Sequence, residues 1–215
     1  MRIFVFVGGD ELVIRWLLVT TDDSPPTTHH RQKSHQAAAI PHCHALDEVS
    51  GVQKMSTPIA VKALAQAVGS VPIMHASLSP EDGTYTIPPG VNVGVAVSTP
   101  SGLAVPCLRN AQEKTLDDIR TDIARLRRLA FDRKLSREDT AGGTVTLSNI
   151  GSVGLFSGIG VIQPGQMALV TVGRAERGRV RVSVSADHRL VDGAILAEFL
   201  ASFRRALLDV AHEEP

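Results

Sequence analysis

The chain has 215 residues, of which 22 are basic and 22 acidic, so its formal net charge at pH 7 is zero. This length suffices to bury one hydrophobic core without disulfides or a structural metal, and a neutral chain argues against nucleic-acid binding, because phosphate contacts require a basic surface. The two cysteines, Cys43 and Cys107, are too few for a disulfide framework or a cysteine-rich metal site and favour a reducing compartment.

The N-terminal region is expected to lie outside the folded domain. The apolar run from Met1 to Val7 is broken by Gly8 and Gly9, and it is shorter than the roughly 20 residues that a membrane span needs. The stretch after Thr20 is polar and turn-forming and has no apolar periodicity. We therefore expect a cytoplasmic chain without a membrane segment that begins with an appendage or linker.

A packed pattern of helices and strands follows. Thr57 and Pro58 predict the N-cap and the first residue of a helix, and Gly69 predicts its end. Two β-branched runs, Val91–Val97 and Gly102–Leu108, predict two strands around a turn. The sequence thus predicts both helices and strands in the first half of the domain.

A second helix is predicted to begin at Thr115, because Asp118 lies three residues later and completes a capping-box pattern. Apolar residues recur along this helix at the spacing of one face, with arginines elsewhere. The apolar face comprises Leu116, Ile119, Ile123, Leu126 and Ala130. Such an amphipathic helix is expected to pack on a sheet.

The last third of the chain predicts three strands and a closing helix. The strands lie at residues 143–149, 166–173 and 179–185, and the third alternates valine with arginine or serine, as in a half-buried strand. Apolar residues at helical spacing predict a helix from Ala194 to about Val210. The order of elements predicts a mixed α/β (α+β) fold, in which helices pack against a β-sheet.

The segment SVSADHRLVDGA joins the last predicted strand to the last helix. His188 could act there as a general base, because an imidazole titrates near neutral pH, and Asp192 could orient the ring or hold the loop. A second interpretation stays open on spacing alone. In it, Asp192 is the N-cap of the helix and His188 is an ordinary turn residue.

Several segments resemble one family. DHRLVDG resembles the DHRxxDG signature of the acyltransferase component of 2-oxoacid dehydrogenase complexes, which is related to chloramphenicol acetyltransferase. GGTVTLSNIGSVG, NVGVAVSTPSGLAVPCLRNA and VPIMHASL are similar to three further segments of that family, in the same order. The similarity runs from about residue 34 to 208. Residues 34–215 are thus identified as a shortened acyltransferase catalytic domain, and residues 1–33 as an unmatched appendage or linker.

The resemblance implies a chloramphenicol acetyltransferase-like fold, a mixed β-sheet sandwich with packed helices. It also implies acyl transfer between a dihydrolipoyl thiol and coenzyme A, without a covalent acyl-enzyme. Matched to the family motifs, His188 is the general base, Ser148 is the hydroxyl that stabilises the oxyanion, and Asp192 is the aspartate that fixes the histidine loop. In the family, the histidine and the serine of one site come from neighbouring subunits, so a homotrimer is expected.

The sequence departs from the family in two ways. The family has a further helix before the one predicted at Pro58, and an arginine of that helix pairs with the aspartate matched by Asp192. Here either Asp192 lacks this partner or Lys54 replaces it imperfectly. No lipoyl or peripheral-subunit-binding domain is recognisable. The lipoyl group is therefore expected in trans, from a lipoyl domain, with the other 2-oxoacid dehydrogenase subunits as partners.

Other polar and reactive residues have simpler expected roles. Cys43 and Cys107 are expected to be inert buried thiols, and His42 with His44 lacks a third ligand, so no metal site is expected. One group of arginines on the second helix either faces solvent or contacts coenzyme A phosphates. The group comprises Arg120, Arg125, Arg127 and Arg128.

Two other functions remain open from the sequence. One is a catalytically silent trimeric scaffold of a 2-oxoacid dehydrogenase complex, and the other is an acyl-CoA-dependent transferase that acts on a small acceptor. For a dihydrolipoamide acyltransferase, the segments TLSNIGS and SADHR resemble members that transfer branched-chain acyl groups. The acyl group is expected to be acetyl or branched-chain.

Overall fold

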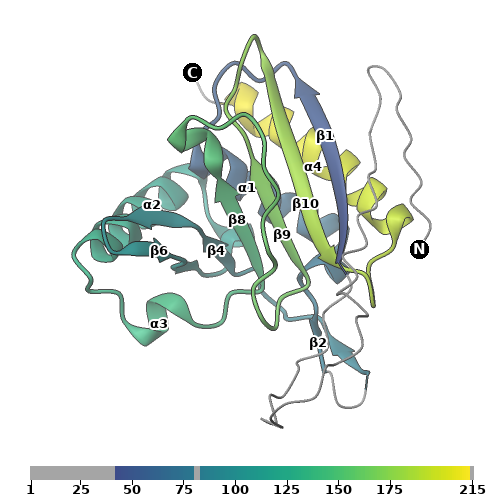
Figure 1. Cartoon of the computed structure of the whole chain (residues 1–215), viewed down its shortest axis with the longest axis horizontal. Helices are drawn as coiled ribbons and strands as arrows, with labels where there is room; N and C mark the ends of the chain where they lie inside the picture. The colour runs from purple at the N-terminus through teal and green to yellow at the C-terminus, as the bar shows by residue number, and fades with distance from the viewer. Residues whose placement is uncertain (1–41, 80–82, 214–215) are drawn as a thin grey trace, which may run out of the picture.

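The structure is a computed structural model that describes residues 42–79 and 83–213, so the predicted appendage at residues 1–33 lies outside the described part. The main sheet is six-stranded and mixed (Figure 1). Strand β8 pairs in parallel with β9 and β4, and the other neighbours are antiparallel. The order is β1 (His42–Ser50), β10 (Arg179–Asp187), β9 (Ala168–Val172), β8 (Val145–Asn149), β4 (Val93–Val95) and β7 (Cys107–Leu108).

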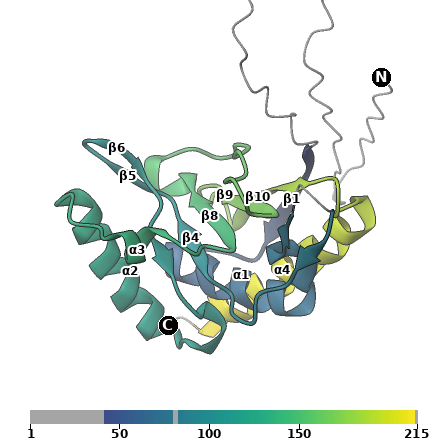
Figure 2. The ribbon, with the colours of Figure 1, turned by 90° about the horizontal axis from the view of Figure 1, so that it is seen from below.

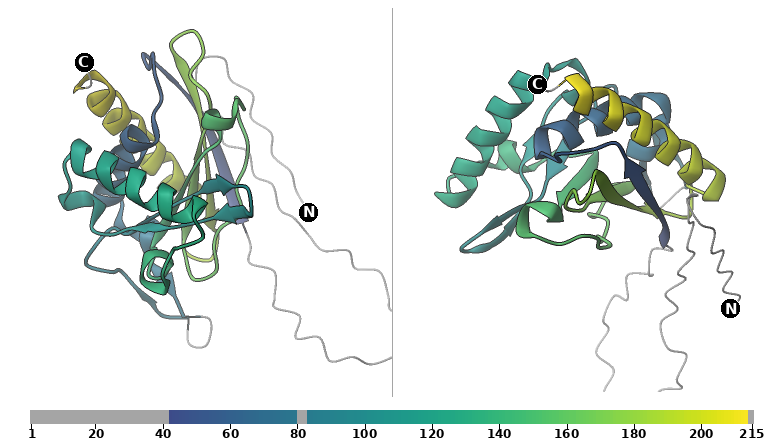
Figure 3. Two further views of the ribbon diagram at one scale, coloured as in Figure 1. Left: turned by 90° about the vertical axis from the view of Figure 1, so that its left-hand side faces the viewer. Right: turned by 90° about the horizontal axis from the view of Figure 1, so that it is seen from above.

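Helices cover one face of this sheet, as Figures 2 and 3 show. They are α1 (Thr57–Ser70), α2 (Leu116–Phe131) and α4 (Gly193–Glu213). The predicted apolar stripe of α4 is buried against the sheet, and so are the alternating valines of β10. The predicted mixed α/β fold is therefore confirmed, with one core between the helices and the sheet. The buried stripe comprises Leu196, Phe199, Leu200, Phe203 and Leu207.

Shorter elements complete the described chain. They are η1 (Pro72–His75), β2 (Ser77–Leu78), β3 (Tyr85–Thr86), β5 (Val97–Thr99), β6 (Gly102–Ala104), η2 (Ala111–Glu113), α3 (Arg137–Thr140) and η3 (Ile150–Val153). Strands β2 and β3 form one two-stranded sheet, and β5 and β6 form another.

The two strands predicted at residues 91–97 and 102–108 are each broken in two. Their outer parts form the β5–β6 hairpin, whereas β4 and β7 join the main sheet. Pro106 lies at one break, where it has no N–H to donate, and its carbonyl accepts a hydrogen bond from Val95. At the other break, Ala96 donates to Leu147 of β8. Hydrophobicity could not predict these breaks, because β-branched residues lie on both sides of them.

The other face of the sheet is covered by the segment from 150 to 166. Ser183 donates a hydrogen bond to the carbonyl of Gly158, and Ser185 donates to the carbonyl of Gly160 at 2.7 Å. Both serines are therefore buried. The prediction of a half-buried strand is correct for the exposed Arg179 and wrong for these serines, because a distant loop covers them.

The helix starts follow capping chemistry. In α2 both capping-box bonds form: Asp118 N donates to Thr115 Oγ1 at 3.1 Å, and Thr115 N donates to Asp118 Oδ2 at 3.0 Å. The N-cap of α1 is Ser56 rather than the predicted Thr57, because Ser56 has an extended backbone and its hydroxyl accepts from Ile59 N. In the described part of the chain, no helix is long and apolar enough to cross a membrane.

Two buried histidines make the stability of this fold sensitive to acid. His75 is 4% exposed, and burial lowers the pKa of both His75 and His44. Because the folded-state pKa lies below the unfolded-state value of about 6.5, this stability is complete above that value and is lost as the pH falls below it. We expect the free energy of unfolding, measured with urea, to fall by at most about 1.4 kcal/mol per pH unit for each histidine.

The variant His75→Asn is expected to show a smaller loss of stability on acidification than the wild type, because asparagine does not titrate. His212→Asn is the matched control, since His212 is exposed. Parallel loss of stability in the wild type and His75→Asn would contradict this role of His75.

Candidate active site

The turn after β10 carries the predicted histidine. Strand β10 ends at Asp187, residues 188–190 form a turn, and α4 begins at Gly193. His188 is half-buried on this turn. Because a core strand precedes the turn and a core helix follows it, both ends of the turn are fixed by packing.

A carboxylate beside the histidine holds the turn together. Asp187 is 2% exposed, and its carboxylate accepts hydrogen bonds from Arg189. The backbone N of Arg189 donates to Oδ1 at 3.0 Å, and its Nε lies 3.0 Å from Oδ1 and 3.1 Å from Oδ2. These hydrogen bonds raise the pKa of the guanidinium. We call this pair the Asp187–Arg189 clamp. Sequence reasoning missed it, although an acid and an arginine two residues apart on either side of His188 were a signal.

Cys43 of β1 lies beneath the same turn. Its Sγ donates to the carbonyl of Ala186 at 3.5 Å and to that of Val191 at 3.4 Å, which bracket the turn. Burial raises the pKa of this thiol to about 11. Cys43 is therefore a protonated thiol at neutral pH and no nucleophile, as expected. Cys107 is also buried, and burial raises its pKa too.

Asp192 acts on the helix rather than on an arginine. It is exposed, and its Oδ1 accepts a hydrogen bond from Ile195 N at 2.9 Å, which is the N-cap bond of α4. Among the described residues it makes no ion pair. The N-cap interpretation of Asp192 is thus confirmed.

Lys54 cannot replace the missing arginine. Strand β1 pairs with β10 so that His42 lies opposite Asp187 and Ser50 lies opposite Arg179. Lys54 follows Ser50, so it lies beyond the end of β1 that is remote from the histidine turn. The nine-residue strand β1 separates the two ends by roughly 25–30 Å. Of the two alternatives, the one in which Lys54 pairs with Asp192 is wrong.

The His44 side chain makes its contacts within the main sheet. Its Nδ1 lies 2.9 Å from Ser185 Oγ, and its ring stacks with that of His42 at 6.2 Å between centroids. Burial, and to a smaller extent His42, lowers the pKa of His44. Within the part of the chain that the structure describes, no group of three or more potential ligands lies close enough to hold a metal ion.

Ser148 lies near the end of β8 and is half-buried. Its side chain shares a face with Thr146, because side chains alternate along a strand. This is the face that the segment from 150 to 166 covers. The next residue, Asn149, points to the helix side, where its Nδ2 donates to Thr57 Oγ1 at 3.1 Å.

The sheet register separates Ser148 from His188 within one chain. Ser148 pairs with Thr171 of β9, and Thr171 pairs with Ser183 of β10. His188 follows the end of β10, five residues beyond Ser183, and lies two strands away from Ser148. At about 3.3 Å per residue and 4.8 Å per strand, the two are roughly 15–20 Å apart. Within one chain they cannot act on the same atom, since catalytic groups need hydrogen-bond contact.

A cavity lies at the end of β8, and exposed apolar residues follow Ser148 in the chain. A cavity of about 340 Å³ reaches Asn149, Thr57 and Ser98 at the end of β8. Large apolar side chains are exposed in the segment that follows Ser148, which is unusual for a surface left to water. They are Val153, Leu155, Phe156, Ile159 and Val161. This surface is defined here as the 153–161 apolar patch.

Comparison with known proteins finds a matching family model and similar proteins. The family model described as 2-oxoacid dehydrogenases acyltransferase (catalytic domain) matches residues 44–212. A mitochondrial lipoamide acyltransferase component of the branched-chain alpha-keto acid dehydrogenase complex, from Arabidopsis thaliana, is 30% identical over 199 residues. The match covers 78% of this chain and 41% of that protein, so the chain spans less than half the length of this relative.

Solved structures agree on the fold. A probable dihydrolipoamide acetyltransferase from Listeria monocytogenes 4b F2365 superposes with a TM-score of 0.76 at 26% identity, over 82% of this chain and 88% of the other. A chloramphenicol acetyltransferase superposes with a TM-score of 0.55 at 16% identity, over 78% of this chain and 88% of the other. The expected chloramphenicol acetyltransferase-like fold is confirmed.

Proposed function

Because the chain belongs to the 2-oxoacid dehydrogenase acyltransferase family through its catalytic domain, we propose that it transfers an acyl group between a dihydrolipoyl thiol and coenzyme A. His188 is the general base and Ser148 stabilises the oxyanion. The observation that carries the proposal is the histidine turn, which the clamp, Cys43 and the cap of α4 hold in one conformation.

The reaction uses two groups of the chain. The imidazole of His188 takes the proton from the attacking thiol, because a thiol with a pKa near 8.5 is mostly unreactive until it is deprotonated. The sulfur then forms a bond to the thioester carbonyl carbon, and the hydroxyl of Ser148 donates a hydrogen bond to the resulting oxyanion. When the intermediate collapses, the old C–S bond breaks and the leaving thiolate takes the proton back from the imidazolium.

The complete site is proposed to form between two copies of the chain. The separation of Ser148 from His188 supports this, since each could meet its counterpart only on another subunit. The 153–161 apolar patch beside Ser148 supplies a surface that a neighbouring copy would cover. A closed homotrimer satisfies both requirements, because the same contact repeats around the ring.

The partners follow from the same proposal. The lipoyl group arrives on a lipoyl domain, and the other subunits of a 2-oxoacid dehydrogenase complex load and reoxidise it. The acyl group is acetyl or branched-chain, in line with the relatives named above. Asp192 supports the histidine turn from its far end by capping α4.

Asp187→Asn is expected to lower kcat about 10- to 100-fold with little change in KM, because small misplacements of a catalytic group are costly. The amide cannot keep the charge-assisted bonds of the Asp187–Arg189 clamp. Asp192→Asn is the matched control and should keep most of the activity, since asparagine caps helices about as well as aspartate. Unchanged kcat in a folded Asp187→Asn protein would refute a positioning role for the clamp.

The proposed function is tested by thiol release from acetyl-CoA, isobutyryl-CoA and succinyl-CoA with dihydrolipoamide as the acceptor. Turnover with the acetyl or isobutyryl thioester is the expected result. No turnover with any of the three would contradict the acyltransferase and favour a silent scaffold. Turnover only after a small hydroxyl or amine acceptor replaces dihydrolipoamide would also overturn the proposal.

A further inference from the structure

A row of three hydroxyl side chains crosses the main sheet at the level of Ser148. Ser148 of β8 pairs with Thr171 of β9, and Thr171 pairs with Ser183 of β10. Residues that pair in register on neighbouring strands share a face of the sheet, and the strands lie about 4.8 Å apart. The side chain of Thr171 therefore lies beside that of Ser148, on the same face and with no strand between them.

The segment from 150 to 166 closes over Thr171. The residue is 3% exposed. A Cβ atom placed on Gly160 would lie 3.2 Å from Thr171 Oγ1, so the backbone of the segment passes close to this hydroxyl. Thr171 thus points to the face that the segment covers, and its hydroxyl is shielded from solvent.

The hydroxyl of Thr171 is buried without a partner. Within residues 42–79 and 83–213, it is the only buried hydroxyl that has no hydrogen bond. The other hydroxyls around it on this face are engaged: Ser183 donates to the carbonyl of Gly158, and Thr146 donates to Gln166 Oε1 at 2.6 Å. Burial of an unpartnered hydroxyl costs free energy. A rotation about χ1 would turn this hydroxyl toward Ser148 and remove that cost.

We propose that the Thr171 hydroxyl donates a hydrogen bond to Ser148 Oγ, and that Thr171 is a positioning residue for acyl transfer. This inference rests on the proposed function, in which Ser148 stabilises the oxyanion. A serine hydroxyl has one proton and two lone pairs. When Thr171 donates to a lone pair, the proton of Ser148 stays available for the oxyanion, and the bond polarises Ser148 into a stronger donor.

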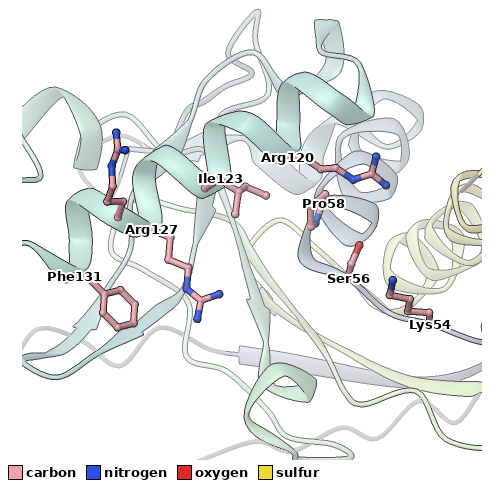
Figure 4. A pocket seen from close by; sticks show the side chains of 9 residues that line it. Lys54, Ser56, Pro58, Arg120, Ile123, Arg127 and Phe131 are labelled. Carbon is pink, nitrogen blue, oxygen red and sulfur yellow. The ribbon is translucent and has the colours of Figure 1, made fainter.

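Thr171 is placed to act on Ser148 without contacting a substrate. It lies on the face of the sheet opposite to α1 and α2, whereas Lys54 and Arg127 line a hollow of about 710 Å³ between these helices (Figure 4). It does not line the cavity of about 340 Å³ at the end of β8 either. Loss of its hydroxyl should therefore change kcat and leave KM unchanged.

Thr171→Val removes the hydroxyl and keeps the branched side chain. We expect kcat for acyl transfer to fall about fivefold, the effect of one net hydrogen bond, with an unchanged KM for both substrates. Thr171→Ser keeps the hydroxyl and should restore kcat to within about twofold of the wild type. Thr146→Val is the matched control, because it makes the same change on the same face at a hydroxyl that Gln166 already engages. An equal loss of kcat in Thr146→Val would overturn the proposal.

A double-mutant cycle with Ser148→Ala separates positioning from a structural effect. If Thr171 acts through Ser148, Thr171→Val lowers kcat in the wild type and has no further effect in Ser148→Ala. A structural role would cause the same fold-loss in both backgrounds, and that result would overturn the proposal.

The same cycle in the free energy of unfolding, measured with urea on the full chain, needs no substrate. Each single variant loses the bond and the double variant loses it only once, so the double variant should lose less stability than the sum of the two. Additive losses, or coupling of Thr171→Val with Ser183→Ala instead, would overturn the proposal. Coupled unfolding without any acyl transfer would retain the bond and refute the proposed function. Acyl transfer with additive cycles would do the reverse.

Discussion

His188→Ala is expected to lower kcat for acyl transfer by about 10³-fold, because the attacking thiol loses the base that accepts its proton. The fold should survive the change, since His188 is half-buried on a turn rather than in the core. The measurement is thiol release from the preferred acyl-CoA with dihydrolipoamide, together with the thermal midpoint of unfolding. If turnover is lost while the thermal midpoint of unfolding stays normal, the loss comes from the chemical step and not from unfolding.

The control for this variant is His212→Ala. His212 is exposed near the end of α4, far along the helix from the histidine turn, so its removal should leave kcat unchanged. Ser148→Ala provides a comparison, with an expected loss of about 100-fold from one missing oxyanion donor. Turnover that persists in His188→Ala would exclude His188 as the base.

Local chemistry explains which elements could be predicted from the sequence. The capping box of Thr115 and Asp118 and the apolar stripe of α4 depend on residues close in the chain, and both were predicted correctly. The burial of Ser183 and Ser185 could not be predicted in the same way. It depends on carbonyls of a loop about 25 residues earlier, and a strand's alternation carries no information about that loop.

The same distinction applies to the candidate site. The sequence identified His188 and Ser148 through motifs, but the distance between them follows from the register of three strands, which pairs residues remote in the chain. The role of Asp187 could not be predicted either, because the spacing of the two aspartates from His188 does not show which of them is buried. Burial decides between the two carboxylates: Asp187 is enclosed by the fold, whereas Asp192 is exposed and caps a helix.

The Asp187–Arg189 clamp provides a support for the histidine turn that does not depend on the helix that the family has before α1. The resemblance implies an arginine from that helix as the partner of Asp192, and its loss predicts a loose histidine turn. In this chain the turn is held by its own arginine and by Cys43. In addition, Arg204 of α4 donates to the buried Asp47 of β1 at 2.9 Å, which ties the helix after the turn to the sheet. The shortened core therefore retains local support for His188.

Two inactive variants, His188→Ala and Ser148→Ala, are expected to restore activity when they assemble together. A site between subunits needs an intact histidine from one chain and an intact serine from its neighbour. In a closed trimer that contains both variants, one of the three sites receives both intact groups, so activity should recover to about a third of the wild type. Each variant alone should retain about 1% or less, from the losses expected above.

The measurement needs both variants in the same ring. Co-expression with two affinity tags and purification through both would isolate mixed assemblies, and a solution mass measurement would give the number of chains. A site built within one chain cannot be repaired in this way, because each chain would still lack one group. The shared site would be refuted by activity no higher than the sum of the two variants, or by a monomeric mass for the active wild type. In that case, because Ser148 and His188 are separated across the sheet, a conformational change would have to bring them together.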